Sequence, residues 1–123
     1  MSESVQQLKK QVDKKFSIHI RSGAADKDGF AVCITCGRKI RWQLMDCGHY
    51  EGRSNNATRY DEKNCAPQCK KCNIWNYGEK PKFALYLIKK YGKGILEELR
   101  EKASQTKQFT IQELRQMINS WGI

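Results

Sequence analysis

The sequence predicts a small α+β domain that zinc holds together, and three observations support this. Four cysteines form two Cys-x-x-Cys pairs, Cys33/Cys36 and Cys69/Cys72, which is the ligand set of a structural zinc site. Only 39% of the 123 residues are hydrophobic, so the core is thin and benefits from a metal. Apolar residues at helical spacing lie at both ends of the chain, with short strand-like runs between them.

The first element is predicted to be an amphipathic helix over residues 3–17. Residues 23–29 are rich in turn formers and predict a loop after it. The helix prediction follows from apolar residues that recur at helical spacing, namely Val5, Leu8, Val12 and Phe16.

Short strands are predicted around the first cysteine pair. Residues 30–36 favour a strand, and Gly37 supplies the sharp turn after it. Residues 39–50 carry alternating apolar side chains that favour a hairpin. Residues 52–63 are polar and predict an irregular loop.

Helices are predicted from the second cysteine pair onward. The first runs from about Cys69 to Tyr77, where Gly78 ends it, and Pro81 suits the first turn of the next.

Two more helices are predicted in the tail. Residues 95–103 carry an apolar stripe, and Thr110 with Glu113 forms a capping box that begins the last helix. We expect one compact domain in three parts: residues 1–29 with the first helix and loop, residues 30–93 with the zinc-bearing core and the helix that follows it, and residues 94–123 as a helical tail that covers the core.

Composition excludes several classes of protein. No stretch approaches the roughly 18 apolar residues of a membrane span, and the polar start of the chain is unlike a signal peptide. Lys and Arg number 23 against 13 Asp and Glu, which gives a net charge of +10. The excess lies before residue 94 and favours a polyanionic partner such as DNA. We therefore expect a cytoplasmic protein with no membrane partner and no small-molecule cofactor.

Zinc is favoured over the other uses of paired cysteines. Disulfides need a secretory context, which the sequence does not indicate. A thioredoxin-like site needs one pair and a βαβ pattern, and no such pattern surrounds either pair. The two pairs are 32 residues apart, so a substantial element is inserted between them. Cys47 and Cys65 are left over and are interpreted as buried thiols, though either can lie near the metal.

One histidine and two asparagines stand in an informative order around the second cysteine pair. His49 ends the run Asp46-Cys47-Gly48-His49, Asn64 precedes Cys69, and Asn73 directly follows Cys72. This order resembles the HNH nucleases, a branch of the ββα-metal fold in which zinc sites often join the hairpin to the helix. The resemblance implies that the chain is a metal-dependent endonuclease with a small ββα-metal (HNH-like) core.

The resemblance assigns a role to each of these side chains. It implies His49 as the general base that activates water, since imidazole titrates near neutral pH. Asn64 fixes the loop that orients His49. Asn73 holds the catalytic Mg²⁺ or Mn²⁺ through a hard oxygen ligand.

Gly48 departs from the HNH pattern, which usually has a metal-binding Asp at that place. The run instead resembles the Asp-x-Gly-His motif of non-specific nucleases in the same superfamily, where one Asn is the only protein ligand. By that resemblance Asp46 holds metal-bound waters or orients His49. Asp61 or Glu62 remain alternative metal ligands.

Basic residues around this motif are candidate DNA contacts. Arg53 and Arg59 flank the predicted site, and one of them is expected to bind the scissile phosphate or its neighbour. Further basic residues are expected to contact the DNA backbone without reading its sequence: Arg38, Lys39, Arg41, Lys70 and Lys71. His19 is interpreted as an ordinary histidine, and Trp42, Trp75 and Tyr77 as core residues.

A longer set of motifs is similar to the phage NinG family, also called Rap. It includes Cys33-Ile34-Thr35-Cys36-Gly37, Gly48-His49-Tyr50-x-x-Arg53, Arg59-Tyr60-Asp61-Glu62-Lys63-Asn64 and Gln68-Cys69-x-x-Cys72-Asn73, in this order. The resemblance covers about residues 16–121. It implies a phage recombination endonuclease in the bacterial cytoplasm that cuts branched DNA such as Holliday junctions and strand-invasion loops. A symmetric junction has two strands to cut, which suggests a homodimer.

Three alternatives stay open. The chain can be a non-catalytic zinc-stabilised DNA-binding module, which needs the cysteines and the basic surface but has no use for His49 with Asn73. It can be an HNH nuclease with another role, such as restriction or DNA packaging. An RNA-binding zinc protein also suits the charge.

Overall fold

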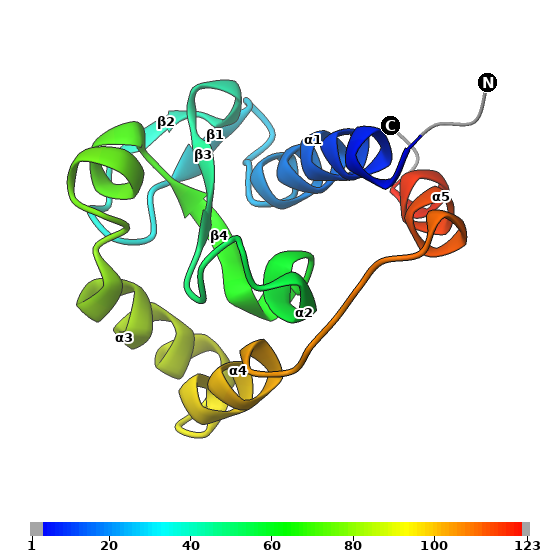
Figure 1. The fold of residues 1–123 in the computed structure, drawn as a ribbon. Helices are drawn as coiled ribbons and strands as arrows, with labels where there is room; N and C mark the ends of the chain where they lie inside the picture. The colour runs from blue at the N-terminus through cyan, green and yellow to red at the C-terminus, as the bar shows by residue number, and fades with distance from the viewer. Residues whose placement is uncertain (1–3, 122–123) are drawn as a thin grey trace.

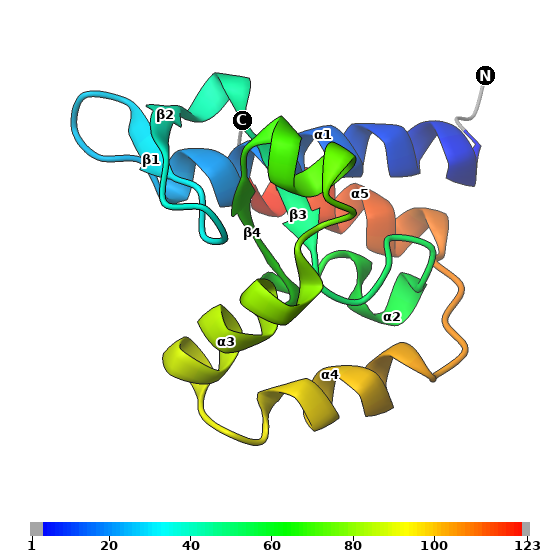
Figure 2. The same cartoon turned by 90° about the vertical axis from the view of Figure 1, so that its left-hand side faces the viewer.

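A two-stranded antiparallel sheet of β3 (Asp46–His49) and β4 (Cys65–Gln68) lies at the centre of the molecule, as the computed structural model of residues 4–121 shows (Figure 1). Its register pairs Asp46 with Gln68 and His49 with Cys65. Every residue of β4 is buried. Helix α1 (Val5–Gly23) packs on one side of the sheet, and α3 (Lys80–Tyr91) with α4 (Ile95–Ala103) packs on the other (Figure 2). The structure confirms a small α+β fold.

The predicted hairpin at residues 39–50 is wrong. Strand β2 (Lys39–Arg41) pairs back with β1 (Phe30–Val32) across the turn at Gly37, whose φ is +80°. The 3₁₀ helix η1 (Trp42–Leu44) then separates β2 from β3. Strand β3 finds its partner only after a loop of 15 residues, so local sequence alone could not pair them.

Helix α1 is longer than predicted at its C-terminal end. Ser4 and Gln7 form a capping box at its start, and residue 3, where the predicted helix begins, lies outside the described residues. No Gly or Pro interrupts the chain before Gly23. Arg21 also bonds back to the carbonyl of Ser17 at 3.1 Å, which supports the last turns.

Two other segments differ from the prediction. The loop over residues 52–63 holds a short helix, α2 (Asn56–Arg59), and leads into a 3₁₀ turn, η2 (Glu62–Asn64). The helix expected over residues 69–77 is reduced to the π-helical η3 (Lys71–Trp75). The chain leaves η3 through three consecutive residues with positive φ, which regular helix cannot accommodate.

The C-terminal helices agree with the prediction. Pro81 lies in the first turn of α3, and Thr110 with Glu113 forms the capping box of α5 (Ile111–Ser120). Helix α5 packs along α1 and buries Leu8, Val12 and Leu114 between them. None of the helices within residues 4–121 combines the length and the apolar character that crossing a membrane requires.

Gly48 is required by close packing inside the central sheet. A Cβ atom at this position would lie 2.0 Å from Oε1 of the fully buried Gln68. The Gln68 amide group cannot move freely, because its Nε2 donates to Thr35 Oγ1 at 3.1 Å and to the carbonyl of Gly78 at 2.9 Å.

We therefore expect Gly48→Ala to lower the free energy of unfolding by about 1–3 kcal/mol, as overpacking of a buried site does. Gly52→Ala is the matched control, since the nearest atom to its Cβ lies at 3.8 Å, and we expect it to change stability by no more than about 0.5 kcal/mol. Urea unfolding of the two variants measures the difference. Equal stabilities would contradict this account of Gly48.

Candidate active site and zinc cluster

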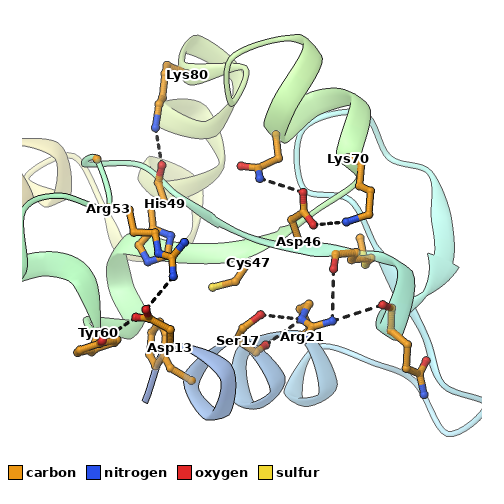
Figure 3. Close-up of a pocket in the computed structure, with 15 residues that line it drawn as sticks. Asp13, Ser17, Arg21, Asp46, Cys47, His49, Arg53, Tyr60, Lys70 and Lys80 are labelled. Atoms are coloured by element: carbon orange, nitrogen blue, oxygen red, sulfur yellow. Dashed lines mark hydrogen bonds and ion pairs between the residues drawn. The ribbon is translucent and has the colours of Figure 1, made fainter. Parts of the chain in front are cut away.

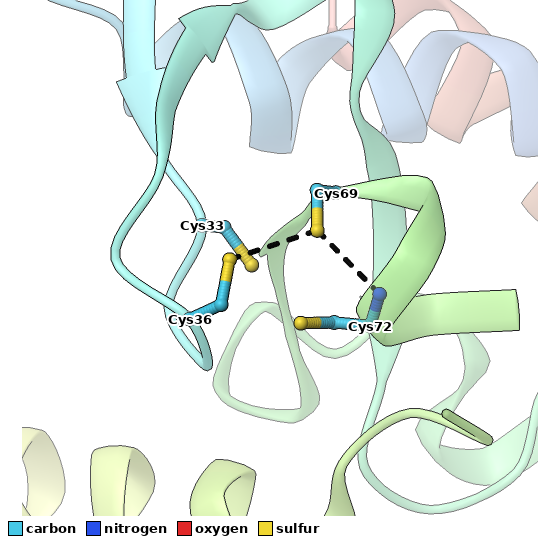
Figure 4. Close-up of side chains that lie close together, drawn as sticks. All are labelled: Cys33, Cys36, Cys69 and Cys72. Atoms are coloured by element: carbon cyan, nitrogen blue, oxygen red, sulfur yellow. Dashed lines mark hydrogen bonds between the residues drawn. The ribbon is translucent and has the colours of Figure 1, made fainter. Parts of the chain in front are cut away.

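The four paired cysteines come together between the β1–β2 turn and the start of η3 (Figure 4). Their sulfur atoms all lie within 4.8 Å of one another, and Cys36 Sγ is 3.7 Å from Cys69 Sγ. The cluster Cys33, Cys36, Cys69 and Cys72 can therefore hold a metal ion with the tetrahedral thiolate set that zinc prefers.

The surroundings of the cluster act on the charge of its sulfur atoms in both directions. The backbone N–H of Cys72 points at Cys69 Sγ at 3.5 Å. Burial opposes ionisation of Cys33, but hydrogen bonds from the Thr35 hydroxyl and from nearby backbone groups lower the pKa of Cys33 to about 6. Burial and the neighbouring sulfurs raise the pKa of Cys72 to about 12. A divalent cation would relieve this repulsion, so the donor set fits zinc.

A cleft of about 560 Å³ lies between α1, the central sheet and the start of α3 (Figure 3). Its wall combines the predicted catalytic residues with side chains from α1 and with one lysine of α3. The main polar residues that line it are Asp13, Ser17, Arg21, Asp46, Cys47, His49, Arg53, Tyr60, Lys70, Asn73 and Lys80. His49, Asp46 and Asn73 are thus brought to one place.

His49 is held as a neutral imidazole. Its Nε2 lies 2.9 Å from the carbonyl oxygen of Arg59. A carbonyl only accepts, so Nε2 carries the hydrogen and Nδ1 is the nitrogen that can take a proton. Burial lowers the pKa of His49; the hydrogen bond to the Arg59 carbonyl opposes this shift, and the positive charge of Arg53 adds to it.

Asn64 fixes the loop that carries the Arg59 carbonyl. It is fully buried, and its Nδ2 donates to the carbonyls of Glu51 at 3.1 Å and of Thr58 at 3.2 Å. Its Oδ1 accepts from the backbone N–H of Glu51 at 2.8 Å. The two ends of the loop are joined through this one side chain, which agrees with the position expected for Asn64.

Asp46 and Asn73 form a pair on the opposite side of the cleft wall. Asn73 Nδ2 donates to Asp46 Oδ2 at 3.0 Å, and Lys70 Nζ pairs with Asp46 Oδ1 at 2.6 Å. The Asn73 carbonyl oxygen and the Asp46 carboxylate are hard ligands that suit Mg²⁺ or Mn²⁺. Among the described contacts, it is Arg59 and not Asp46 that orients the ring of His49.

Asp61 and Glu62, the alternative metal ligands, lie outside the cleft lining. Asp61 pairs with Lys102 at 2.7 Å and Glu62 with His19 at 2.6 Å. The structure therefore does not favour either carboxylate as a ligand at this site. The side chain of His19 is 38% exposed and lies outside the cleft lining.

The two arginines that are candidate phosphate contacts, Arg53 and Arg59, differ in how much of the side chain is exposed to solvent. Asp13 of α1 pairs with Arg59 at 2.7 Å and with Arg53 at 2.8 Å. The side chain of Arg59 is 14% exposed and that of Arg53 is 59% exposed. Tyr60 completes the group by donating to Asp13 at 2.6 Å. Burial alone would raise the pKa of Asp13, but the bonds from Arg59 and Tyr60 hold it below its usual value.

The remaining predicted DNA contacts lie on the surface outside the cleft. Lys39 pairs with Asp26 at 3.1 Å, and the Arg41 guanidinium lies 5.0 Å from the centre of the Phe30 ring. Arg38 and Lys71 are exposed. All of them are accessible to a nucleic-acid backbone.

Sequence reasoning missed three charged residues of the cleft: Asp13, Arg21 and Lys80. Asp13 had a usable signal, because it is the only acidic residue of a basic helix. Lys80 had none. Its Nζ donates to the backbone carbonyls of His49 and Tyr50, so it ties α3 to the end of β3.

Two aromatic residues are not in the core, contrary to prediction. The side chains of Trp75 and Tyr77 are 76% and 87% exposed, beside Asn73. The π-helical turn and the positive φ of Tyr77 direct this segment outward. Trp42 is half-buried and packs against the hydrophobic cluster that includes Cys33, Cys69 and Cys72.

A comparison with family models adds independent information. The chain matches the model described as Bacteriophage Lambda NinG protein over residues 2–122. The chain belongs to the NinG family. No curated protein and no solved structure matches it, so the ββα-metal character of the NinG core stays a prediction.

Substitution of one cysteine tests whether the four-cysteine cluster of this NinG chain binds a stabilising zinc ion. We expect Cys69→Ser to lower Tm by more than about 10 °C, because a thin core loses the metal that joins two segments. Gln43→Ala changes an exposed side chain outside the cluster; it is the control and should lower Tm by less than about 5 °C. Thermal unfolding with metal analysis measures both. Retention of full zinc content by Cys69→Ser would argue against a four-cysteine site.

The state of the NinG imidazole can be measured directly. We expect an NMR titration to give His49 a pKa below its ordinary value of 6.5, because burial favours the neutral ring. The ring is then neutral at pH 7 and gains its proton only as the pH falls. The His49→Gln spectrum assigns the signals. A pKa above 6.5 would contradict the proposed environment.

Proposed function

We propose that this NinG protein is a metal-dependent endonuclease that hydrolyses phosphodiester bonds in branched DNA. The observation that carries the proposal is a single cleft lined by a neutral histidine, an Asp–Asn oxygen pair and an exposed arginine. Each is a component that phosphodiester hydrolysis needs: a base, a place for a hard cation and a phosphate contact.

His49 acts as the general base. Because Nε2 donates to the Arg59 carbonyl, Nδ1 accepts a proton from a water molecule. The oxygen of that water attacks the phosphorus atom, and the bond to the 3′ oxygen breaks. The leaving oxygen takes up a proton from solvent. The products carry a 5′ phosphate and a 3′ hydroxyl.

Asn73 and Asp46 would hold the catalytic cation. Their two oxygen donors fit Mg²⁺ or Mn²⁺, with water as the other ligands. A cation bound there supplies positive charge next to the scissile phosphate. Lys70 pairs with Asp46 at 2.6 Å, so it keeps this carboxylate in place and compensates its charge.

Arg53 is the better phosphate contact of the two arginines. The side chain of Arg53 is mostly exposed and lines the cleft, whereas the side chain of Arg59 is largely buried in its ion pair with Asp13. An Arg fork can bind two phosphate oxygens at once. Lys71, Arg38 and Arg41 extend the basic surface beyond the cleft for backbone contacts.

Membership of the NinG family supports the choice of branched recombination intermediates as substrate. The dimer hypothesis is less direct. The apolar faces of α1 and α5, two candidate dimer surfaces, pack against each other within one chain. Sedimentation of the chain with and without junction DNA tests it, and a monomer in both cases would count against a dimer.

Cleavage of a labelled four-way junction beside a linear duplex of equal length, with Mg²⁺, tests the proposal. We expect His49→Gln to lose activity by about 100-fold or more while it still binds DNA, as loss of a general base does. His19→Gln is the matched control, since His19 is the only other histidine, and it should stay within about twofold.

Each other result has a definite meaning. Equal cutting of both DNAs would keep the nuclease and discard the branched substrate. Tight binding without cleavage by the wild type would indicate a zinc-stabilised binding module. Full activity in His49→Gln would exclude His49 as the base, and 3′ phosphates at the cut ends would exclude the proposed line of attack.

A further inference from the structure

A second group of atoms that could bind a metal lies at the wall of the cleft, apart from the four-cysteine cluster. The Sγ atoms of Cys47 and Cys65 and a ring nitrogen of His49 all lie within 4.8 Å of one another. Cys47 and His49 are two residues apart on β3 and so share a face of the sheet. Cys65 is the register partner of His49 on β4. Strand pairing therefore brings the three side chains to one point.

The distances are close to those of a bound metal. Sulfurs about 2.3 Å from a tetrahedral zinc lie about 3.8 Å from each other. The separations in this group are at most 4.8 Å, the same limit that the four-cysteine cluster satisfies. A shift of about 1 Å or less, within reach of side-chain rotation, completes the geometry.

The type of ligand selects the type of metal. Two thiolates and an imidazole favour zinc, cadmium and other thiophilic ions, whereas Mg²⁺ and Mn²⁺ prefer oxygen. Asp46 and Asn73 provide the oxygen ligands elsewhere in the cleft, so the two kinds of ion would use different side chains.

The group is reachable from solvent. Cys47 is half-buried, and its side chain points into the cleft near the centre of Figure 3. Cys65 is buried beneath it, with its Sγ 4.0 Å from the Arg59 carbonyl. Three protein ligands leave a fourth position for water, as in zinc sites that stay open to solvent.

We propose that Cys47, His49 and Cys65 form a second metal site for zinc or another thiophilic divalent ion, and that a metal bound there inhibits the enzyme. A metal on Nδ1 would take the lone pair that accepts the proton, and a metal on Nε2 would leave the hydrogen of the neutral ring on Nδ1, so in either case the imidazole cannot accept a proton from water. The inhibition rests on the proposed nuclease function, whereas the binding itself does not.

Metal content tests the binding without any assay of activity. The whole chain, kept reduced with a phosphine, is equilibrated with micromolar zinc and desalted, and zinc per chain is measured. We expect the wild type to retain one more zinc ion than Cys47→Ser. Gln43→Ala, a change at the same cleft that removes no thiol, should match the wild type. Equal zinc content in the wild type and Cys47→Ser would overturn the site.

Zinc sensitivity tests the consequence. In the presence of Mg²⁺, we expect added zinc to inhibit the wild type and Gln43→Ala at least about tenfold more strongly than Cys47→Ser. Equal inhibition of the three proteins would overturn the inhibitory role even if the extra zinc is found. If no protein cleaves DNA, the proposed nuclease function fails, and the zinc count alone decides whether the second site exists.

Discussion

The position of His49, the proposed general base, depends on one buried amide, that of Asn64. The hydrogen bonds of this amide join the start and the middle of the loop between β3 and β4. This closure places the Arg59 carbonyl against His49. A buried amide left without partners costs free energy, so the loop has little freedom to open locally. Asn64 thus sets the tautomer of His49 through the backbone of Arg59.

Helix α1 supports the same loop through the charge of Asp13, which pairs with Arg53 and Arg59. Asp13 accepts hydrogen bonds from the Arg59 guanidinium and the Tyr60 hydroxyl, so α1 holds the side chain of Arg59. The backbone carbonyl of Arg59 accepts the hydrogen bond from His49. Arg53 pairs with the same carboxylate but stays largely exposed. One acidic side chain in a basic helix therefore pairs with two arginines, of which Arg59 is largely buried in support of the site and Arg53 stays exposed to solvent.

The sequence was sufficient to predict the parts of the site that follow from short motifs. The four-cysteine group and the placement of His49 and Asn73 in one cleft follow from the order of short motifs along the chain. The pairing of β3 with β4 depends on the long loop between them, and Asp13 and Lys80 reach the cleft from distant helices. These contacts have no local signal, because only tertiary packing brings them together. Gly48 shows the same limit. A larger residue is excluded there by the side chain of Gln68, and the two residues come together only through the pairing of β3 with β4.

The packing of α5 on α1 has a consequence for how the protein is made. Helix α1 is synthesised before α5, so Leu8 and Val12 cannot contact Leu114 until α5 has left the ribosome. Asp13, which pairs with Arg53 and Arg59, lies on the same helix. The packing that supports this side of the cleft is therefore completed late, and a fragment that lacks α5 would expose the apolar face of α1 to solvent.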